Sequence, residues 1–130
     1  MRKLVFLLLL AGLGGNADAA WTLVNQGDEV NAYADPATIR ASGNFVSMLN
    51  LMDFHTAIHP ANQPFLSRRD EVEYDCEEQR YRDLVFSVYS GNMGNGEVLY
   101  TEALPGEWAR VPLGSVAEIM FKIACQAPSP

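Results

Sequence analysis

Two histidines and a run of carboxylates come closest, by residue type and spacing, to a metal site. His55 and His59 are four residues apart, a spacing that brings two imidazoles to one zinc ion only on a helix. Pro60 and the turn-forming residues around it favour a loop. The acids between Asp70 and Glu78 are calcium-ligand types, but alternation along a strand spreads same-face carboxylates over ~7 Å steps. We therefore expect a solvated acidic face and no metal site.

Catalytic chemistry has as little support. Ser67, Ser87 and Ser90 become nucleophiles only beside a partnered histidine, and neither histidine stands in such a motif. Acid–base hydrolysis needs two carboxylates with separated pKa values in a cleft, and the sequence gives no evidence of a cleft. We expect a protein that is not an enzyme and binds no cofactor. A concave pocket with a carboxylate of raised pKa would instead favour a small envelope hydrolase.

Glycine spacing between residues 91 and 96 is similar to that of a phosphate-binding loop. Gly91, Gly94 and Gly96 would serve that purpose in a turn from a strand into a helix, but here a strand is expected to follow. We interpret the glycines as a tight turn that needs positive φ.

Arginines and tyrosines are the residues that we expect to bind a protein partner, because both types are enriched at binding hot spots. An equally simple role for the arginines is to neutralise the acidic strand beside them. Trp21 and Trp108 present a similar choice between exposed anchors and core residues, with the core favoured. The candidate partner-binding residues are Arg68, Arg69, Arg80, Arg82, Tyr81 and Tyr89.

Residues 1–19 predict a secretory signal. Two basic residues precede an apolar run, Leu4 to Leu13, and residues 17–19 match the small-x-small cleavage pattern. The apolar run has roughly half of the ~20 residues that span a bilayer, so we expect no membrane span. A lipid anchor needs a cysteine where Leu13 stands, so none is expected.

Residues 20–130 are expected to form one exported domain, in the periplasm or at the cell surface. Without the signal the chain keeps seven basic and fifteen acidic side chains, a net charge near −8. This charge argues against nucleic acid and anionic lipid as partners. An oxidising compartment favours a disulfide between the only two cysteines, Cys76 and Cys125.

Strand patterns fill most of this domain. The second strand is expected to stop at Asp35-Pro36, because proline has no N–H to donate to a ladder. A turn at residues 41–44 precedes a long central strand, and residues 55–64 are expected to form a loop. The expected strands cover residues 21–24, 30–34, 45–54, 65–76, 81–90 and 97–101, the last of them ending the sheet.

The two strands on either side of Gln79 predict a hairpin. If their apolar residues face one core, even-numbered residues pair with even-numbered ones, and the loop needs an odd number of residues, most simply 77–79. The residues that this places in the core are Val72, Tyr74, Cys76, Leu84, Phe86 and Val88, with Glu71, Glu73 and Asp75 on the solvated side.

Gly114 to Cys125 predicts a short amphipathic helix. Ser115 and Glu118 form a capping box, in which each side chain accepts a hydrogen bond from the other residue's amide. About ten residues cannot hold a helix without packing, so Cys125 is placed to tie this helix to the sheet. The apolar stripe is Val116, Ile119, Met120, Ile123 and Ala124.

An ordered set of motifs spans the whole mature chain and resembles the bacterial surface-adhesin protein E family. The resemblance implies an α+β fold, an antiparallel sheet of about six strands with a C-terminal helix tied to one face by a disulfide. It also implies a binding role, since the type member is an adhesin for host matrix and plasma proteins, and a homodimer. The residues that carry it are Trp21, Tyr33-Ala34-Asp35-Pro36, Ile39, Asp53, Ser67, Asp75-Cys76, Arg80-Tyr81-Arg82, the segment from Ser90 to Gly96, Trp108, Gly114-Ser115 and Cys125.

The sequence thus predicts an exported, non-enzymatic protein that binds a protein partner, such as a host matrix or plasma protein if it is displayed at the surface. One alternative is a periplasmic structural or inhibitory module that binds a bacterial envelope protein. The other is the small envelope hydrolase.

Overall fold

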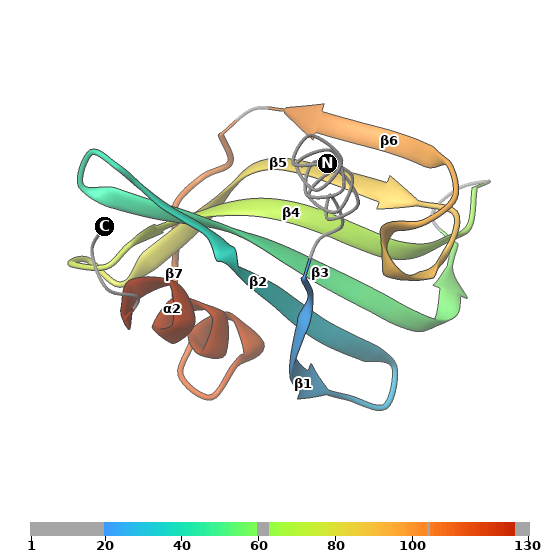
Figure 1. Ribbon diagram of the computed structural model, residues 1–130, viewed down its shortest axis with the longest axis horizontal. Helices are drawn as coiled ribbons and strands as arrows, with labels where there is room; N and C mark the ends of the chain where they lie inside the picture. The colour runs from blue at the N-terminus through green and yellow to red at the C-terminus, as the bar shows by residue number, and fades with distance from the viewer. Residues whose placement is uncertain (1–19, 60–62, 104, 127–130) are drawn as a thin grey trace, which may run out of the picture.

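The computed structural model describes residues 20–59, 63–103 and 105–126, so the expected signal at residues 1–19 lies outside it. It confirms an α+β fold, an antiparallel sheet with one C-terminal α-helix (Figure 1). No helix among the described residues is long and apolar enough to cross a membrane. The elements are β1 (Thr22–Gln26), β2 (Val30–Ser42), β3 (Phe45–Ile58), β4 (Phe65–Asp75), β5 (Arg80–Tyr89), the 3₁₀ turn η1 (Asn92–Gly94), β6 (Val98–Ala103), β7 (Ala109–Arg110) and α2 (Val116–Gln126).

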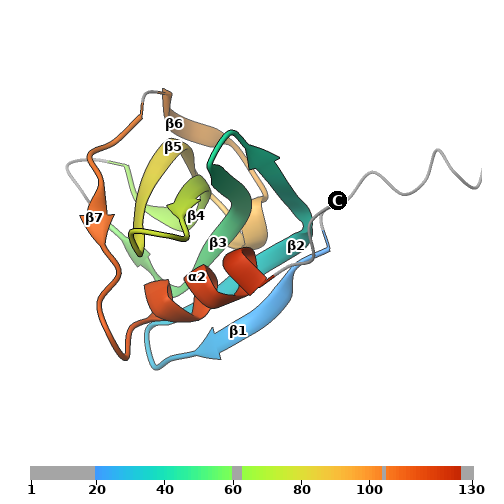
Figure 2. The same cartoon turned by 90° about the vertical axis from the view of Figure 1, so that its left-hand side faces the viewer.

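The first six strands form a meander in which each strand pairs with the one before it. The sheet is strongly twisted, and α2 lies against one of its faces (Figure 2). The expectation that the sheet ends at Thr101 is wrong, because β7 also pairs with β5. After β6 the chain keeps to the edge of β5, where the amides of Gly106 and Val111 donate to the carbonyls of Asp83 and Gln79.

The second strand was expected to stop at Asp35-Pro36, but β2 continues through the proline to Ser42. Its pairing with β3 is regular up to Asp35, shifts, and resumes at Arg40, so the proline lies where no ladder donor is needed. The Thr38 hydroxyl bridges the gap: Oγ1 donates to the carbonyl of Asp35 at 2.6 Å and accepts from the amide of Leu49 at 2.9 Å. A side chain thus replaces the missing backbone partner.

The central strand β3 runs four residues further than predicted. The turn before it is confirmed but shorter, because Ser42 already pairs with Phe45, and Gly43 takes the positive φ of 63°. At its other end β3 reaches Ile58, which pairs with Phe65 after a shift in register. The loop expected from residue 55 is therefore strand as far as Ile58.

The predicted β4–β5 hairpin is present, but its expected register is wrong near the turn. The turn has four residues, 76–79, so Asp75 pairs with Arg80 and Tyr74 with Tyr81, which joins odd-numbered residues to even-numbered ones. One extra residue at Leu84 then shifts the pairing, and beyond it Asp70 faces Phe86, even with even. Because of this β-bulge, side chains on both sides of Leu84 reach the face that α2 covers.

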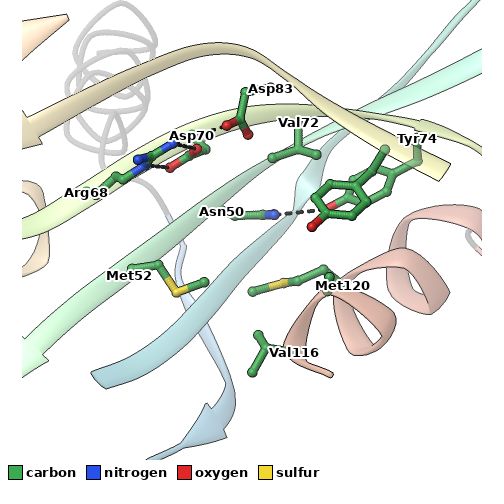
Figure 3. Close-up of a pocket in the computed structure, with 11 residues that line it drawn as sticks. Asn50, Met52, Arg68, Asp70, Val72, Tyr74, Asp83, Val116 and Met120 are labelled. Atoms are coloured by element: carbon green, nitrogen blue, oxygen red, sulfur yellow. Dashed lines mark hydrogen bonds and ion pairs between the residues drawn. The ribbon is translucent and has the colours of Figure 1, made fainter. Parts of the chain in front are cut away.

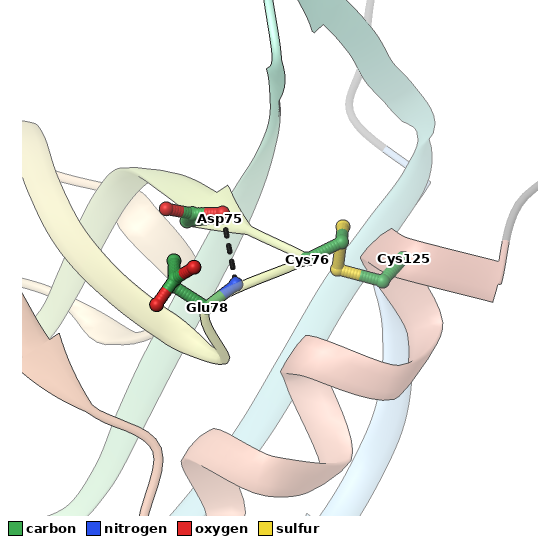
Figure 4. Close-up of a disulfide and its surroundings, with 4 residues drawn as sticks. All are labelled: Asp75, Cys76, Glu78 and Cys125. Atoms are coloured by element: carbon green, nitrogen blue, oxygen red, sulfur yellow. Dashed lines mark hydrogen bonds between the residues drawn. A yellow bond between two sulfur atoms is a disulfide. The ribbon is translucent and has the colours of Figure 1, made fainter.

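Helix α2 and the cysteine bridge close one side of the core. Met120 and Ala124 are buried against Ala32, Met48 and Tyr74, among others. Phe121, outside the predicted stripe, packs edge-on against Tyr74, whereas Ile119 is 36% exposed. A disulfide joins Cys76, directly after β4, to Cys125 in the last turn of α2, as predicted (Figure 4).

The start of α2 is capped by two side chains. The amide of Glu118 donates to Ser115 Oγ at 3.1 Å. The Glu118 carboxylate accepts from the amide of Gly114 at 3.0 Å, one residue before the amide that the capping box predicts. The first bond satisfies a donor that a helix start would leave unpaired, and the second holds the residue before the cap.

Candidate functional site

A pocket of about 310 Å³ lies between the first turns of α2 and the strands β3, β4 and β5 (Figure 3). Alternate residues of a strand share a face, so even-numbered residues of β3 and β4 line it together, as the pair Asn50 and Asp70 illustrates. Asp83 of β5 pairs with Val72 and therefore lies on the same face. The polar end of the pocket consists of Asn50, Arg68, Asp70 and Asp83.

Arg68 holds the two carboxylates together. Its Nε and Nη2 donate to Asp70 Oδ1 and Oδ2, both at 2.8 Å, and Nη2 also donates to Asp83 Oδ2 at 3.1 Å. The hydrogen bond to Asp70 is the main reason that the pKa of Arg68 is raised above its ordinary value. The guanidinium also lies 3.8 Å from the ring centre of Phe86, a cation–π contact that fixes its plane.

Burial raises the pKa of Asp83 to about 6, and the neighbouring Asp70 carboxylate adds to the rise, while Arg68 opposes it. The side chain of Asp83 is still 39% exposed and that of Arg68 32%, so this end of the pocket reaches solvent. Small changes in pH around 6 therefore change the charge at the opening of the pocket.

Deeper in the pocket, Asn50 is only 8% exposed. Its Nδ2 donates to the Tyr74 hydroxyl at 2.8 Å (Figure 3), while its Oδ1 has no hydrogen-bond partner in the described chain. Burial raises the pKa of Tyr74, which keeps the phenol neutral. This polar end was not predicted from the sequence. The available signal was Asn50 itself, an amide between Leu49 and Leu51 in the central strand.

The pocket contains a carboxylate of raised pKa, Asp83, which is the feature expected to favour a hydrolase. The partner carboxylate of Asp70, however, accepts two hydrogen bonds from Arg68 and is held as an ion pair. The described residues that line the pocket include no serine, cysteine, histidine or lysine that could act as a nucleophile or base. Asp83 carries the raised pKa, while Asp70 is committed to its ion pair with Arg68.

A second group, which we call the arginine–tryptophan cluster, consists of Arg80, Arg82 and Trp108 on the opposite face of the sheet. The two guanidinium carbons lie 4.6 and 4.3 Å from the Trp108 ring centre. Arg80 pairs with Asp75 at 2.9 Å and Arg82 with Glu73 at 2.8 Å.

The acidic face of β4 is not solvated in this part of the sheet, contrary to expectation. Glu73 and Asp75 are 7% and 4% exposed, because Arg82 and Arg80 pair with them, and Trp108 stacks on the two arginines. Burial acts to raise the pKa of Asp75, but hydrogen bonds from the Glu78 amide (Figure 4) and from Arg80 outweigh it and lower the pKa below its ordinary value. The arginines thus neutralise the acidic strand, the second of the two roles considered for them.

The six candidate partner-binding residues do not form one surface. Arg68 and Tyr81 lie on the pocket side, where Tyr81 stacks on Tyr74 with ring centres 6.5 Å apart. Arg69 is exposed on the other face, 5.8 Å from the ring centre of Tyr89, which is itself only 6% exposed.

The glycine-rich segment from Ser90 to Glu97 folds back over β3 and β4. The amide of Met93 donates to Asp53 Oδ1 at 2.7 Å, and that of Gly94 to Ser67 Oγ at 2.9 Å. The amide of Glu97 donates to Ser90 Oγ. These three amides are engaged within the protein, so in this conformation they cannot cradle a phosphate. The geometry supports a tight turn with positive φ at Gly94 and Gly96, but Gly91 has a φ of −111°.

The remaining polar candidates also bond locally. His55 lies on β3, not on a helix, and its Nδ1 is 2.8 Å from the carbonyl oxygen of Asp28. Ser67 donates to the carbonyl of Gly91, and the Ser87 hydroxyl is 2.8 Å from that of Thr101. Within residues 20–59, 63–103 and 105–126, no group of three or more His, Cys, Asp or Glu side chains is placed to hold a metal ion.

Comparison with known proteins adds a family and a fold. The family model described as surface-adhesin protein E matches residues 21–126. A solved structure of Haemophilus influenzae protein E has a TM-score of 0.60 at 14% identity, covering 84% of this chain and 87% of that one. Its crystal form II has a TM-score of 0.58 at 12% identity, covering 85% and 97%. No curated protein matches the chain.

Proposed function

Because the chain belongs to the surface-adhesin protein E family, we propose that it is an exported binding protein that recognises another protein and catalyses no reaction. The fold that it shares with Haemophilus influenzae protein E supports this proposal. A displayed protein would meet host matrix or plasma proteins, whereas a periplasmic one would bind a component of the bacterial envelope.

The arginine–tryptophan cluster is the observation that carries the proposal. Arginine and tryptophan are the residue types most enriched at binding hot spots. Here Glu73 and Asp75 hold the arginines against the Trp108 ring, so few side-chain rotations remain to be frozen on binding. Arg80 and Arg82 nevertheless keep 39% and 25% of their side-chain surface exposed, which leaves guanidinium surface for a partner.

Charge reversal at Arg80 and Arg82 is a poor test of this cluster, because new carboxylates would face the buried Glu73 and Asp75 and unfold the strand pair. A better variant is Arg80→Lys with Arg82→Lys, which keeps both charges and removes the planar stacking on Trp108. Its matched control, Arg40→Lys, makes the same change at an exposed arginine of β2, outside the cluster.

The experiment is a pull-down with the mature protein against bacterial envelope extract and against a panel of purified matrix and plasma proteins. We expect a partner that the double-lysine variant binds at least tenfold more weakly at an almost unchanged Tm, whereas the control variant binds normally. Equal binding by both variants would reject the cluster, and no captured protein from either source would reject the function.

Cell fractionation distinguishes the two settings. A host-directed adhesin must be accessible to protease added to intact cells, whereas a periplasmic module is released only after the outer membrane is opened. The family resemblance also supports a homodimer, for which light scattering of the purified protein should give twice the mass of one chain.

A further inference from the structure

Beyond partner binding, we propose that the pocket beneath α2 binds a protonated amine carried on an apolar stem. Such a ligand is either a free alkylamine or the lysine side chain of another protein. The site lies on the helix-covered face of the sheet, opposite the arginine–tryptophan cluster, so it is independent of the function proposed above.

Charge at the polar end favours a cation. Arg68 is the one cationic side chain among the described lining residues, and it already donates to both Asp70 and Asp83. With both acids ionised, the three groups together carry one negative charge. The Arg68 guanidinium also occupies the space between the carboxylates that a metal ion would need, whereas an ammonium group needs only one free oxygen.

Unused acceptors point to a ligand that donates hydrogen bonds. Asn50 Oδ1 is buried without a partner in the described chain, and a buried acceptor left unpaired costs free energy. Asp83 binds Arg68 through Oδ2 alone, which leaves Oδ1 for a ligand. An ammonium group has three N–H donors and no acceptor, so it can donate to either of these oxygens.

The rest of the pocket suits an apolar stem. Met52, Val72, Val116 and Met120 line it between the sheet and the helix (Figure 3). Tyr74 and Tyr81 add two phenol rings, and an aromatic face attracts an ammonium group. At about 310 Å³ the pocket is at the small end of ligand sites, which favours a short stem over a large ring system.

An anionic ligand fits less well. It would meet Asp70 and Asp83 at the polar end, while at the helix start the Glu118 carboxylate already binds the amide of Gly114. The charged groups that act on Asp83 are Asp70 and Arg68 of β4, and the phenol rings of Tyr74 and Tyr81 line the same pocket.

The test uses hexylammonium as the probe, with hexanol and hexanoate as uncharged and anionic controls of the same length. Binding is followed at pH 7 by chemical shifts of the Met52 and Met120 methyl groups, which line the pocket. We expect saturable shifts with hexylammonium and at least tenfold weaker binding of either control. Equal binding of all three, or no saturation by hexylammonium, would overturn the proposal.

The variants separate charge from shape. Asp83→Asn keeps the size of the side chain and should weaken hexylammonium binding at least tenfold, whereas Glu77→Gln, the same change at an exposed turn residue, should not weaken it. Ala117→Leu fills the pocket without touching a carboxylate and should abolish binding in a protein that still melts cooperatively. If Ala117→Leu folds and binds hexylammonium normally, the pocket is not the site.

The pH profile provides a further readout. The probe stays protonated below pH 9, whereas Asp83 gains a proton as pH falls through about 6. Binding should therefore weaken from pH 7 to pH 5 in the native protein and stay flat in Asp83→Asn. Parallel profiles in the two proteins would overturn the role of Asp83.

The two sources of the amine are distinguished with a short blocked peptide, acetyl-Ala-Lys-Ala-amide, and its Nε-acetylated form. Binding of the unmodified peptide, lost on acetylation, assigns the pocket to a lysine of another protein. Binding of hexylammonium alone assigns it to a free alkylamine. Equal binding of both peptides would contradict recognition of the ammonium group.

Discussion

Ion pairing within the sheet decides what its charged side chains can do. Asp70 accepts two bonds from Arg68, and Asp83 accepts one. Glu73 and Asp75 are covered by Arg82 and Arg80. Each of these arginines stabilises an acid that burial would otherwise penalise, so removing one leaves a poorly solvated carboxylate behind. The same arginines can contact a partner only through the surface that remains exposed.

Asp83 should make the stability of the protein depend on pH. Its pKa is about 6 in the folded protein, above the ordinary value of 3.8. The folded state therefore holds this proton more tightly than the unfolded state. The stability that the proton contributes is complete below pH 3.8 and is lost as pH rises through 6.

We expect native protein to lose stability relative to Asp83→Asn between pH 4 and pH 6.5. The loss should be about 1 kcal/mol or less, since the side chain is 39% exposed and solvent screens its charge. Urea unfolding of both proteins at four pH values measures it, with Glu77→Gln as the control. A stability difference that does not change with pH would contradict the raised pKa.

At the scale of elements, two glycines with positive φ differ in what surrounds them: Gly96 in the loop from Ser90 to Glu97, and Gly43 in the β2–β3 turn. Gly96 has a φ of 84°, which L side chains rarely adopt, and a Cβ there would lie 2.4 Å from Ser90 Oγ. Gly43, in the β2–β3 turn, has a φ of 63° but nothing within 4 Å of the position of a Cβ. The two positions therefore share the backbone strain and differ in steric contact.

Gly43→Ala should cost about 1–2 kcal/mol from the left-handed backbone alone. Gly96→Ala should cost more, because the added methyl group displaces the Ser90 hydroxyl, which accepts a hydrogen bond from the amide of Glu97. Equilibrium urea unfolding compares the two. Equal costs would mean that Ser90 moves away freely and that its hydrogen bond contributes little to the loop.

Most elements were predicted from the sequence, but not the side-chain hydrogen bonds and register changes that adjust the sheet locally. Strand periodicity, the helix stripe and the two cysteines predicted the hairpin, α2 and the disulfide. The strand through Pro36 was missed because the Thr38 hydroxyl, a side chain outside the ladder, supplies the donor and acceptor there. The pocket was missed because the expected three-residue loop pairs even-numbered residues with even-numbered ones, whereas the four-residue turn pairs Val72 with Asp83 and so places Asp83 on the face of Asp70.

At the scale of the molecule, one short helix covers a face of the sheet that would otherwise be open. The 11 residues of α2 cannot hold a helix in water by themselves. Their packing on Ala32, Met48 and Tyr74 and the bond from Cys125 to Cys76 keep them in place. The pocket depends on the same anchoring, because Val116, Ala117 and Met120 form one of its walls.

Replacing both cysteines by serine should therefore destabilise the whole domain and loosen the helix in particular. The disulfide spans 49 residues of sequence, and a crosslink of that length removes unfolded-state entropy worth about 4 kcal/mol at most. That is a large share of the 5–15 kcal/mol typical of a domain. Urea unfolding of the oxidised protein and of Cys76→Ser with Cys125→Ser measures the loss.

Hydrogen exchange should show α2 losing its protection before β3 and β4, which keep their neighbours in the sheet. Intact-mass measurement under non-reducing conditions must first show two hydrogens fewer than the reduced chain. Equal stability of the two proteins would mean that packing alone holds the helix.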